Sequence, residues 1–265
     1  MLLFSVWDIG WDAPIQDQER VRDLADRGSE YLRTYLRGVA KDVEQERIRC
    51  DTKVSAGHPA AEILAAITGS GIDLVAMATH SRTATTEGRR GSVADKVLRS
   101  SVSPVLAVGP ISRAAAPGPR PALIRRILVL LDGTEDAERG LLFALELGPP
   151  LSASIEVLRV VPKLLEEYGA ALPEGYLAPI DEERRDEATR YLADVQKRHP
   201  GIAAAHVEMG APRREIPVFL DKSRFNLVVM MSRSVHGRGK WALGGVADQV
   251  IEGPIPVIIV PPPAG

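Results

Sequence analysis

The hydrophobic residues of this chain fall into two kinds of segment that alternate along its length. Short, almost continuously apolar runs predict buried β-strands, and longer segments with apolar residues at helical spacing predict amphipathic helices. Strands that alternate with helices predict βαβ units, so the expected fold class is α/β, with parallel sheets covered by helices on both faces. The predicted strands are Leu2–Val6, Ile48–Val54, Leu74–Ala78, Pro104–Val108, Arg126–Leu131, Ile155–Val161, Ala203–Val207, Leu227–Met231 and Val257–Val260. The predicted helices are Gln16–Val43, Ala60–Thr68, Glu135–Leu147 and Asp181–Arg198, whereas Pro162–Ile180 is predicted to be an irregular surface segment.

One stretch of the sequence, from Asp73 to Val108, occurs a second time from Asn226. Each copy consists of an apolar run, a polar loop containing glycine and arginine, a short helix and a final apolar run. Gly91 of the first copy corresponds to Gly244 of the second, 153 positions later. The same offset relates further identical pairs, which begin at Gly57, Pro59, Glu62, Ile63, Leu74, Met77, Ser81, Val93, Ala94, Asp95 and Val97. So long a period predicts two tandem domains rather than an array of small units.

The two copies are separated by a segment rich in proline, glycine and alanine, Arg113–Pro121. This composition disfavours a helix and stiffens the chain, as is typical of a linker. The predicted domains are therefore residues 1–112 and 125–265, with a linker at residues 113–124. The first copy contains nothing that corresponds to Arg126–Leu147, so we expect its domain to lack an opening strand and helix.

The composition narrows the classes of function. A net charge of −2 over 265 residues gives no overall field that would attract nucleic acid or a membrane surface. Cys50 is the single cysteine, which excludes a disulfide framework and a four-thiolate zinc site. No apolar run approaches the roughly 20 residues needed to span a bilayer, and the first residues do not resemble a signal peptide. We therefore expect a cytoplasmic protein with neither nucleic acid nor membrane as a partner.

Two turns are candidates for ligand binding, because ligands of open α/β sheets bind at the carboxyl ends of the strands. One is Asp132-Gly133-Thr134, which follows a predicted strand, and the other is the loop Ser232–Gly245. A small-residue turn before a helix offers free backbone N–H groups to a phosphate. In the first copy, Ser92 is either the cap of a helix that begins at Val93 or a phosphate donor. The arginines of both loops either contact phosphate or are ordinary surface charges.

These motifs in combination resemble the universal stress protein family. The resemblance rests on a strand followed by Asp-Gly-Thr, then Gly-x-Pro, then Gly-Ser-Val-Ala-x-x-Val and Pro-Val-Leu-x-Val, and it covers nearly the whole chain as two tandem domains. It implies doubly wound parallel sheets of the adenine-nucleotide alpha-hydrolase-like type, with strand order 3-2-1-4-5. Nucleotide-binding members of the family carry an aspartate after the first strand and the pattern G-x2-G-x9-G-[ST].

The chain keeps the spacing of this pattern but not all of its glycines. The resemblance implies cofactor-binding residues in the second domain, namely Leu131, Asp132, Gly133, Thr134, Val160, Met230, Met231, Arg233, Ser234, Gly244, Gly245 and Val246. In the first domain the implied residues are Ala78, Ser81, Gly91, Ser92 and Val93. Met231 is bulky where the family has a glycine, and Gly245 lacks the hydroxyl that would face a phosphate.

The resulting expectation is a stress-response protein that acts by binding rather than turnover, because no catalytic residues are identified. It would sense ATP or AMP mainly in the second domain and bind it weakly, with no metal other than the magnesium that accompanies a nucleotide. The alternative is a nucleotide-free universal stress protein that acts as a protein-interaction module through its dimerisation strands. An enzyme of the nucleotidyl-transfer type is the third class, for which no catalytic partner is found.

The resemblance also implies how the chain assembles. The last strands of the two halves, Pro104–Val108 and Pro256–Val260, would pair to give an internal pseudo-dimer, and a homodimer of whole chains is the other expected assembly. In the first half, the absence of a central strand leaves Leu2–Val6 and Leu74–Ala78 without a common neighbour. Either these two strands pair directly, or a partner chain fills the gap, or the natural protein starts upstream of Met1.

Overall fold

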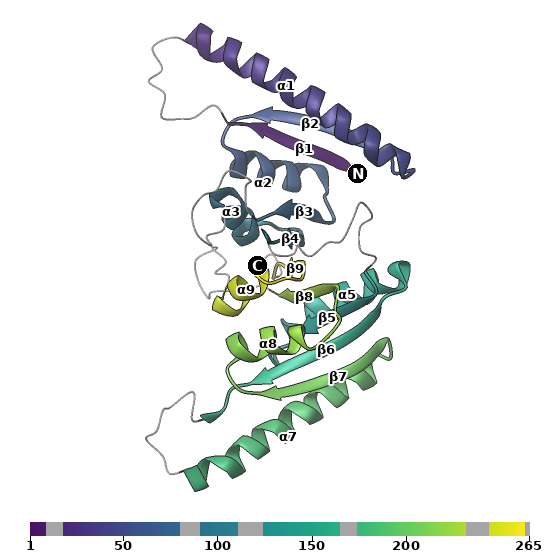
Figure 1. The fold of residues 1–265 in the computed structure, drawn as a ribbon, viewed down its shortest axis with the longest axis vertical. Coiled ribbons are helices and arrows are strands. Elements are labelled where there is room, and N and C mark those ends of the chain that lie inside the picture. The colour runs from purple at the N-terminus through teal and green to yellow at the C-terminus, as the bar shows by residue number, and fades with distance from the viewer. Residues whose placement is uncertain (9–17, 80–90, 111–123, 165–173, 232–243, 263–265) are drawn as a thin grey trace. The chain divides into compact units, whose positions relative to one another are not determined.

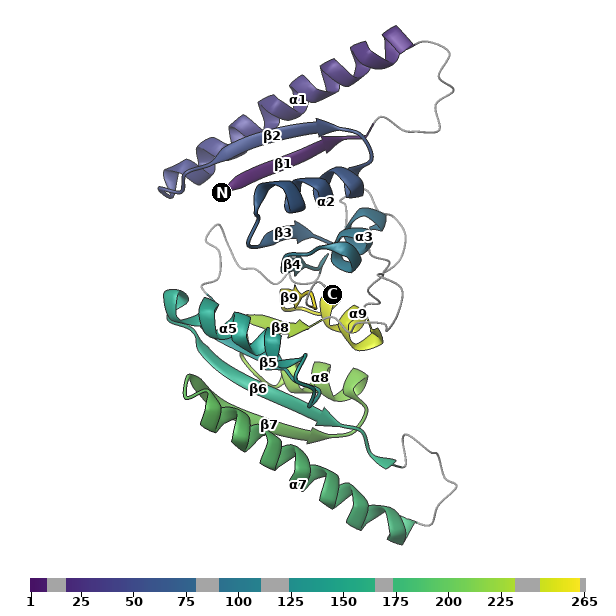
Figure 2. The same ribbon diagram turned by 180° about the vertical axis from the view of Figure 1, so that it is seen from behind.

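A computed structural model describes residues 1–8, 18–79, 91–110, 124–164, 174–231 and 244–262 of the chain. By compactness the chain divides into two units, Met1–Ile72 and Asp73–Gly265, which are called unit 1 and unit 2 below. Figures 1 and 2 show the elements of each unit from opposite sides.

Unit 1 contains a small parallel sheet with two helices. Its elements are β1 (Leu2–Trp7), α1 (Gln18–Gln45), β2 (Asp51–Ala56) and α2 (Pro59–Ser70). β1 pairs with β2 in parallel, from Leu2 opposite Asp51 to Trp7 opposite Ala56. Pro59 is placed at the start of α2, where its missing N–H costs nothing, and Gly71 ends the helix in the left-handed conformation.

Unit 2 is built on one seven-stranded sheet of order β3-β4-β9-β8-β5-β6-β7. Five of these strands come from the second half of the chain, and their order β7-β6-β5-β8-β9 corresponds to 3-2-1-4-5, as predicted. All of the ladders within that half are parallel. The strands are β3 (Val75–Ala78), β4 (Val105–Val108), β5 (Arg126–Leu130), β6 (Ser154–Val161), β7 (Ile202–Met209), β8 (Leu227–Met231) and β9 (Val257–Val260).

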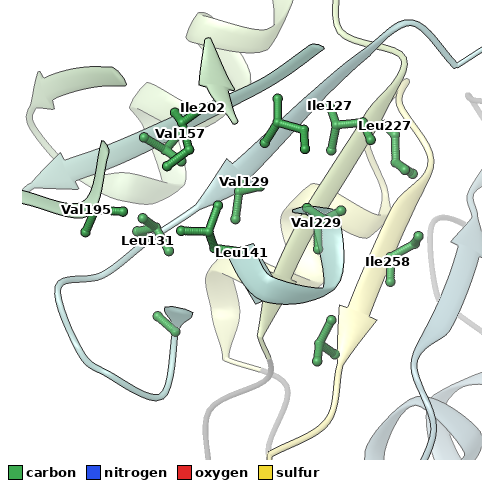
Figure 3. Packing of buried hydrophobic residues seen from close by; sticks show 14 of the residues in the cluster. Ile127, Val129, Leu131, Leu141, Val157, Val195, Ile202, Leu227, Val229 and Ile258 are labelled. Atoms are coloured by element: carbon green, nitrogen blue, oxygen red, sulfur yellow. The ribbon is translucent and has the colours of Figure 1, made fainter. Parts of the chain in front are cut away.

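Helices cover both faces of this sheet. Leu141 of α5 (Glu138–Leu151) and Val195 of α7 (Glu174–Arg198) belong with Val129 and Val157 to one buried hydrophobic cluster, which Figure 3 shows. On the other face, Phe219 of α8 contacts the ring of His206 at 5.1 Å between centroids. The helices of unit 2 are α3 (Ser92–Ser100), α5 (Glu138–Leu151), α7 (Glu174–Arg198), α8 (Pro212–Asp221) and α9 (Gly245–Ile251).

The last strands of the two halves pair with each other, which confirms the predicted pairing of these two strands. β4 and β9 run antiparallel, with Leu106 opposite Ile258. Beyond this ladder, a Cβ on Gly109 would lie 2.6 Å from the carbonyl oxygen of Ile251, so only glycine allows the backbones to approach there. Because β4 joins the sheet of the second half, the compact units do not coincide with the predicted domain boundaries.

Several details differ from the sequence predictions. α7 begins at Glu174, so Pro162–Ile180 is not irregular throughout, and Pro179 lies inside the helix. α5 extends to Leu151 and includes two prolines in its last turn. β1 and β3 belong to different sheets, so direct pairing of these two strands is not found among the described residues.

The antiparallel register of β4 and β9 predicts a site-specific cross-link. Residues directly opposite in an antiparallel pair have Cα separations of about 4.5–5.5 Å, which a disulfide can span. In a Cys50→Ser background, Leu106→Cys combined with Ile258→Cys should form an intrachain disulfide on mild oxidation, detectable as linked tryptic peptides. The control pair Leu106→Cys with Val257→Cys places the thiols on opposite faces of the sheet. Equal cross-linking of both pairs, or cross-links only between chains, would contradict the register.

The neighbours of β3 and β8 predict different rates of amide hydrogen exchange. β8 lies between β5 and β9 and is almost entirely buried, whereas β3 pairs with β4 alone in the described structure and alternates between half-buried and exposed positions. After correction for intrinsic rates, amides of residues 74–78 should exchange roughly tenfold or more faster than those of residues 227–231. Equal protection of the two strands would mean that β3 has a second partner.

Candidate functional site

The carboxyl ends of β5, β6 and β8 form one edge of the unit 2 sheet. β5 pairs in parallel with β6 on one side and β8 on the other. From β5 the chain continues into α5 on one face, and it reaches β8 from α8 on the opposite face. The boundary between β5 and β8 is therefore the switch point at which open α/β sheets form ligand crevices. Both turns singled out in the sequence adjoin this edge, since one follows β5 and the other begins after β8.

The turn after β5 is organised by the carboxylate of Asp132. Its Oδ1 accepts hydrogen bonds from the backbone N–H of Thr134 at 3.0 Å and from the Thr134 hydroxyl at 2.6 Å. The Thr134 hydroxyl oxygen accepts a further hydrogen bond from the N–H of Ala137 at 3.2 Å. Aspartate commonly stabilises turns by bonding the backbone two residues on. The carboxylate is thus held in a fixed place at the edge of the sheet while the side chain stays exposed.

Gly133 brings the backbone of this turn against a guanidinium group. Its φ is +93°, a conformation that favours glycine. A Cβ at this position would lie 2.7 Å from Cζ of Arg159, a residue near the end of β6. The same Cζ lies 5.0 Å from the ring centroid of Tyr191. Arg159 is therefore fixed between the ring and the turn, and within the described parts of the chain it forms no ion pair.

Tyr191 connects Arg159 to a partly buried ion pair. The hydroxyl of Tyr191 donates to Glu138 Oε1 at 3.2 Å, and Arg198 donates to both oxygens of that carboxylate, at 2.7 and 2.8 Å. The hydrogen bonds from Arg198 lower the pKa of Glu138, although burial acts in the opposite direction. Burial, together with the charge of Glu138, raises the pKa of Tyr191 well above its usual value. The ring that supports Arg159 is therefore neutral and held at its hydroxyl end.

The second turn ends in two glycines at the start of α9. Gly244 is the N-cap residue, and in the described structure no atom lies within 4 Å of the place a Cβ would take. Gly245 is contacted by Arg213 of α8, whose Nε donates to the carbonyl oxygen of Gly245 at 3.1 Å. A Cβ on Gly245 would lie 2.6 Å from Cζ of Arg213. The guanidinium therefore fills the space of a side chain at position 245.

The predicted cofactor-binding residues of the second domain differ in how far they are exposed to solvent. Leu131 belongs to the buried core and Met230 is 9% exposed, so both side chains are largely inaccessible to solvent. Val160 lies near the carboxyl end of β6, and Met231 ends β8 in a partly buried position. Val246 follows Gly245 in α9. Arg233 and Ser234 lie outside the described residues, as does Ser81 of the first domain.

The first-domain candidates lie around the start of α3. Ala78 ends β3, and the backbone N–H of Gly91 donates to the carbonyl oxygen of Thr79 at 2.9 Å. The prediction that Ser92 caps a helix beginning at Val93 is wrong, because the helix begins at Ser92 and Gly91 is its N-cap residue, without a side-chain cap. Asp95 of the same helix pairs with Arg99 at 2.7 Å.

Sequence analysis missed Arg159 and Arg213. Arg159 stands out only as a cation within the apolar run Ile155–Val161, and Arg213 directly follows the proline of the second Gly-x-Pro motif. Each contacts a glycine of a different turn, which no local pattern could have indicated. In the described residues no group of three or more histidine, cysteine, aspartate or glutamate side chains is placed to hold a metal ion. No helix of the described chain is long and apolar enough to cross a membrane.

The strand order 3-2-1-4-5 and the turn at its switch point define the class of the protein as a doubly wound α/β fold of the adenine-nucleotide alpha-hydrolase-like type. The model of the universal stress protein family matches residues 5–109 and again residues 123–261. The chain therefore belongs to the universal stress protein family, whose members are stress-response proteins, and contains two copies of its domain.

Known proteins agree with this assignment. A universal stress protein of Methanocaldococcus jannaschii is 27% identical over 146 residues, which cover 53% of this chain and 84% of the relative. The crystal structure of a universal stress protein from Archaeoglobus fulgidus has a TM-score of 0.66 at 21% identity, over 97% of this chain and 86% of that one. A Pseudomonas aeruginosa protein of unknown function has a TM-score of 0.65 at 16% identity, over 98% of this chain and 92% of its own. At these identities the solved structures show the fold alone.

The contact between Gly133 and Arg159 predicts a strong effect of a single methyl group. Gly133→Ala should lower the free energy of unfolding by about 1–3 kcal/mol, because it combines an unfavourable φ with displacement of the guanidinium. Gly91→Ala is the matched control, since its φ is −60° and the nearest atom to the new Cβ is at 3.5 Å. Urea unfolding measures both variants. Equal stability of the two would show that the turn tolerates a side chain and that Arg159 is not fixed against it.

Proposed function

We propose that this protein binds an adenine nucleotide, ATP or AMP, at the carboxyl edge of the unit 2 sheet, and that it acts in the stress response by binding rather than turnover. The observation that carries this proposal is the turn of Asp132, Gly133 and Thr134 after the central strand β5. Its carboxylate can accept hydrogen bonds from the hydroxyl groups of a ribose or from an amino group of a base.

The surrounding residues suit a nucleotide in charge and in backbone access. Arg159 and Arg213 place positive charge beside the two turns, and Gly244 leaves its backbone open to close approach. Guanidinium groups have the planar donor geometry that phosphate oxygens prefer. Met231 opposes tight binding, because it stands where the nucleotide-binding members have glycine. We therefore expect weak binding, with magnesium only as the counter-ion of the nucleotide.

The alternative function, a nucleotide-free interaction module that uses the last strands, is less well supported. β4 lies between β3 and β9, and β9 lies between β4 and β8. Each of these strands therefore has neighbours on both sides within one chain, and neither presents a free edge to another protein. A homodimer and the cytoplasmic location remain expectations from the sequence.

Titration calorimetry with ATP and adenosine tests the proposal. Asp132→Ala should weaken the binding of both ligands by about 1–3 kcal/mol, since one or two hydrogen bonds to a fixed carboxylate are lost. Asp136→Ala is the control, because it removes the same charge from an exposed position in the same loop. The folded state of each variant is checked by its thermal unfolding.

Two results would contradict the proposal. One is wild-type protein that gives no heat, and no competition with a fluorescent ATP analogue, at millimolar ATP. The other is Asp136→Ala weakening binding as much as Asp132→Ala, which would mean that the effect comes from the net charge of the loop and not from the carboxylate at the switch point.

A further inference from the structure

The guanidinium group of Arg213 fills the space in which a family member with serine or threonine at the last position of the pattern would have its side chain. The pattern ends in glycine followed by serine or threonine, and here Gly245 stands at the last position. The Arg213 guanidinium fills the side-chain space of Gly245 and is anchored to its carbonyl oxygen through Nε at 3.1 Å. The missing hydroxyl is therefore replaced in space by a cation from a different helix.

The internal duplication shows that positions 213 and 245 both differ from their counterparts in the first copy. At the repeat offset of 153 residues, Arg213 corresponds to Ala60 and Gly245 corresponds to Ser92. The first copy thus combines a small residue with a hydroxyl, and the second combines an arginine with a glycine. A side chain at position 245 would meet the guanidinium where it lies in the structure, so the glycine at this position accommodates Arg213.

The guanidinium also retains hydrogen-bonding capacity. In the described structure, only Nε of Arg213 donates a hydrogen bond. The side chain is exposed and forms no ion pair with the described residues. Its neighbour Arg214 differs in this respect, since it pairs with Glu215 at 2.8 Å. The remaining N–H groups of Arg213 form the planar fork that binds phosphate oxygens in a bidentate manner.

We propose that Arg213 is the phosphate-binding residue of the nucleotide site in unit 2 and takes the place of the family's hydroxyl. This inference rests on the nucleotide binding proposed above. It makes the site selective for nucleoside phosphates over nucleosides, because the guanidinium contacts only the phosphate part of the ligand. A residue that merely tethers α8 to α9 would support adenosine and ATP equally.

The test compares the dissociation constants of ATP and adenosine by titration calorimetry in the full chain. Arg213→Ala should weaken ATP binding on the order of 10- to 100-fold, as expected for a lost charged hydrogen bond, and change adenosine binding by less than about twofold. The matched control Arg214→Ala, which removes the same charge one residue away, should leave both constants within about twofold.

A double variant tests the replacement of the hydroxyl directly. With the guanidinium removed, Arg213→Ala/Gly245→Ser has room for the serine and should regain part of the ATP affinity. Gly245→Ser alone should lose ATP affinity, because the side chain displaces Arg213. If Arg213→Ala does not fold, Arg213→Gln keeps a donor to the Gly245 carbonyl and removes the charge, and it should show the same selective loss of ATP.

The possible outcomes separate this inference from the function on which it rests. Binding of neither ligand by the wild type overturns both. Two results overturn the role of Arg213 and leave the nucleotide site in place. In the first, Arg213→Ala weakens the binding of adenosine and of ATP equally. In the second, Arg213→Ala and Arg214→Ala lower the affinity for ATP to the same extent. Selective loss of ATP with recovery in the double variant supports the inference.

Discussion

The position of β5 between β6 and β8 is the constraint on which the rest of unit 2 depends. Its residues Ile127, Leu128 and Val129 are completely buried, and the strand has parallel neighbours on both sides. A strand buried on both faces is apolar where it crosses the sheet, so after Arg126 the next polar residue of this segment is Asp132, beyond the carboxyl end of the strand. Asp132 and Gly133 therefore lie where the helices diverge to opposite faces. The fold thus sets the position of this turn at the switch point, and the sequence supplies its polar groups.

Duplication and divergence explain the organisation of the whole chain. The antiparallel ladder of β4 and β9 joins the last strands of both copies into one sheet, and Gly109 lets the chain pass close to Ile251. The two copies share the Gly-x-Pro turn, in which a glutamate packs over the glycine, at Gly57 with Glu62 and at Gly210 with Glu215. They differ at the candidate site, where only the second copy has the aspartate turn and the paired Arg213 and Gly245.

The sequence predicted most strands because they are largely apolar, but β2 spans Asp51–Ala56 instead of the predicted Ile48–Val54 and is mainly polar. The fixed offset between the copies indicated the tandem repeat, and the family resemblance implied the pairing of the last strands. Helix ends were less predictable. α7 starts at Glu174 although the many Glu, Gly and Pro residues of Pro162–Ile180 suggested an irregular segment, since a single proline within the helix, Pro179, removes only one helical hydrogen bond. The contacts of Arg159 with Tyr191 and of Arg213 with Gly245 join residues that are 32 positions apart in each case, so only the fold could reveal them. The predicted residues in loops beyond β3 and β8 fall outside the described structure.

The central claim is that one edge of one sheet binds the nucleotide, and amide hydrogen exchange of the full chain with and without saturating ATP and magnesium tests it most directly. The account predicts slower exchange in residues 131–134 and 244–246 on addition of ATP, with no change in the equivalent residues 91–93 of the first copy. Unchanged exchange throughout the chain at millimolar ATP, or protection confined to the amino ends of the strands, would contradict it.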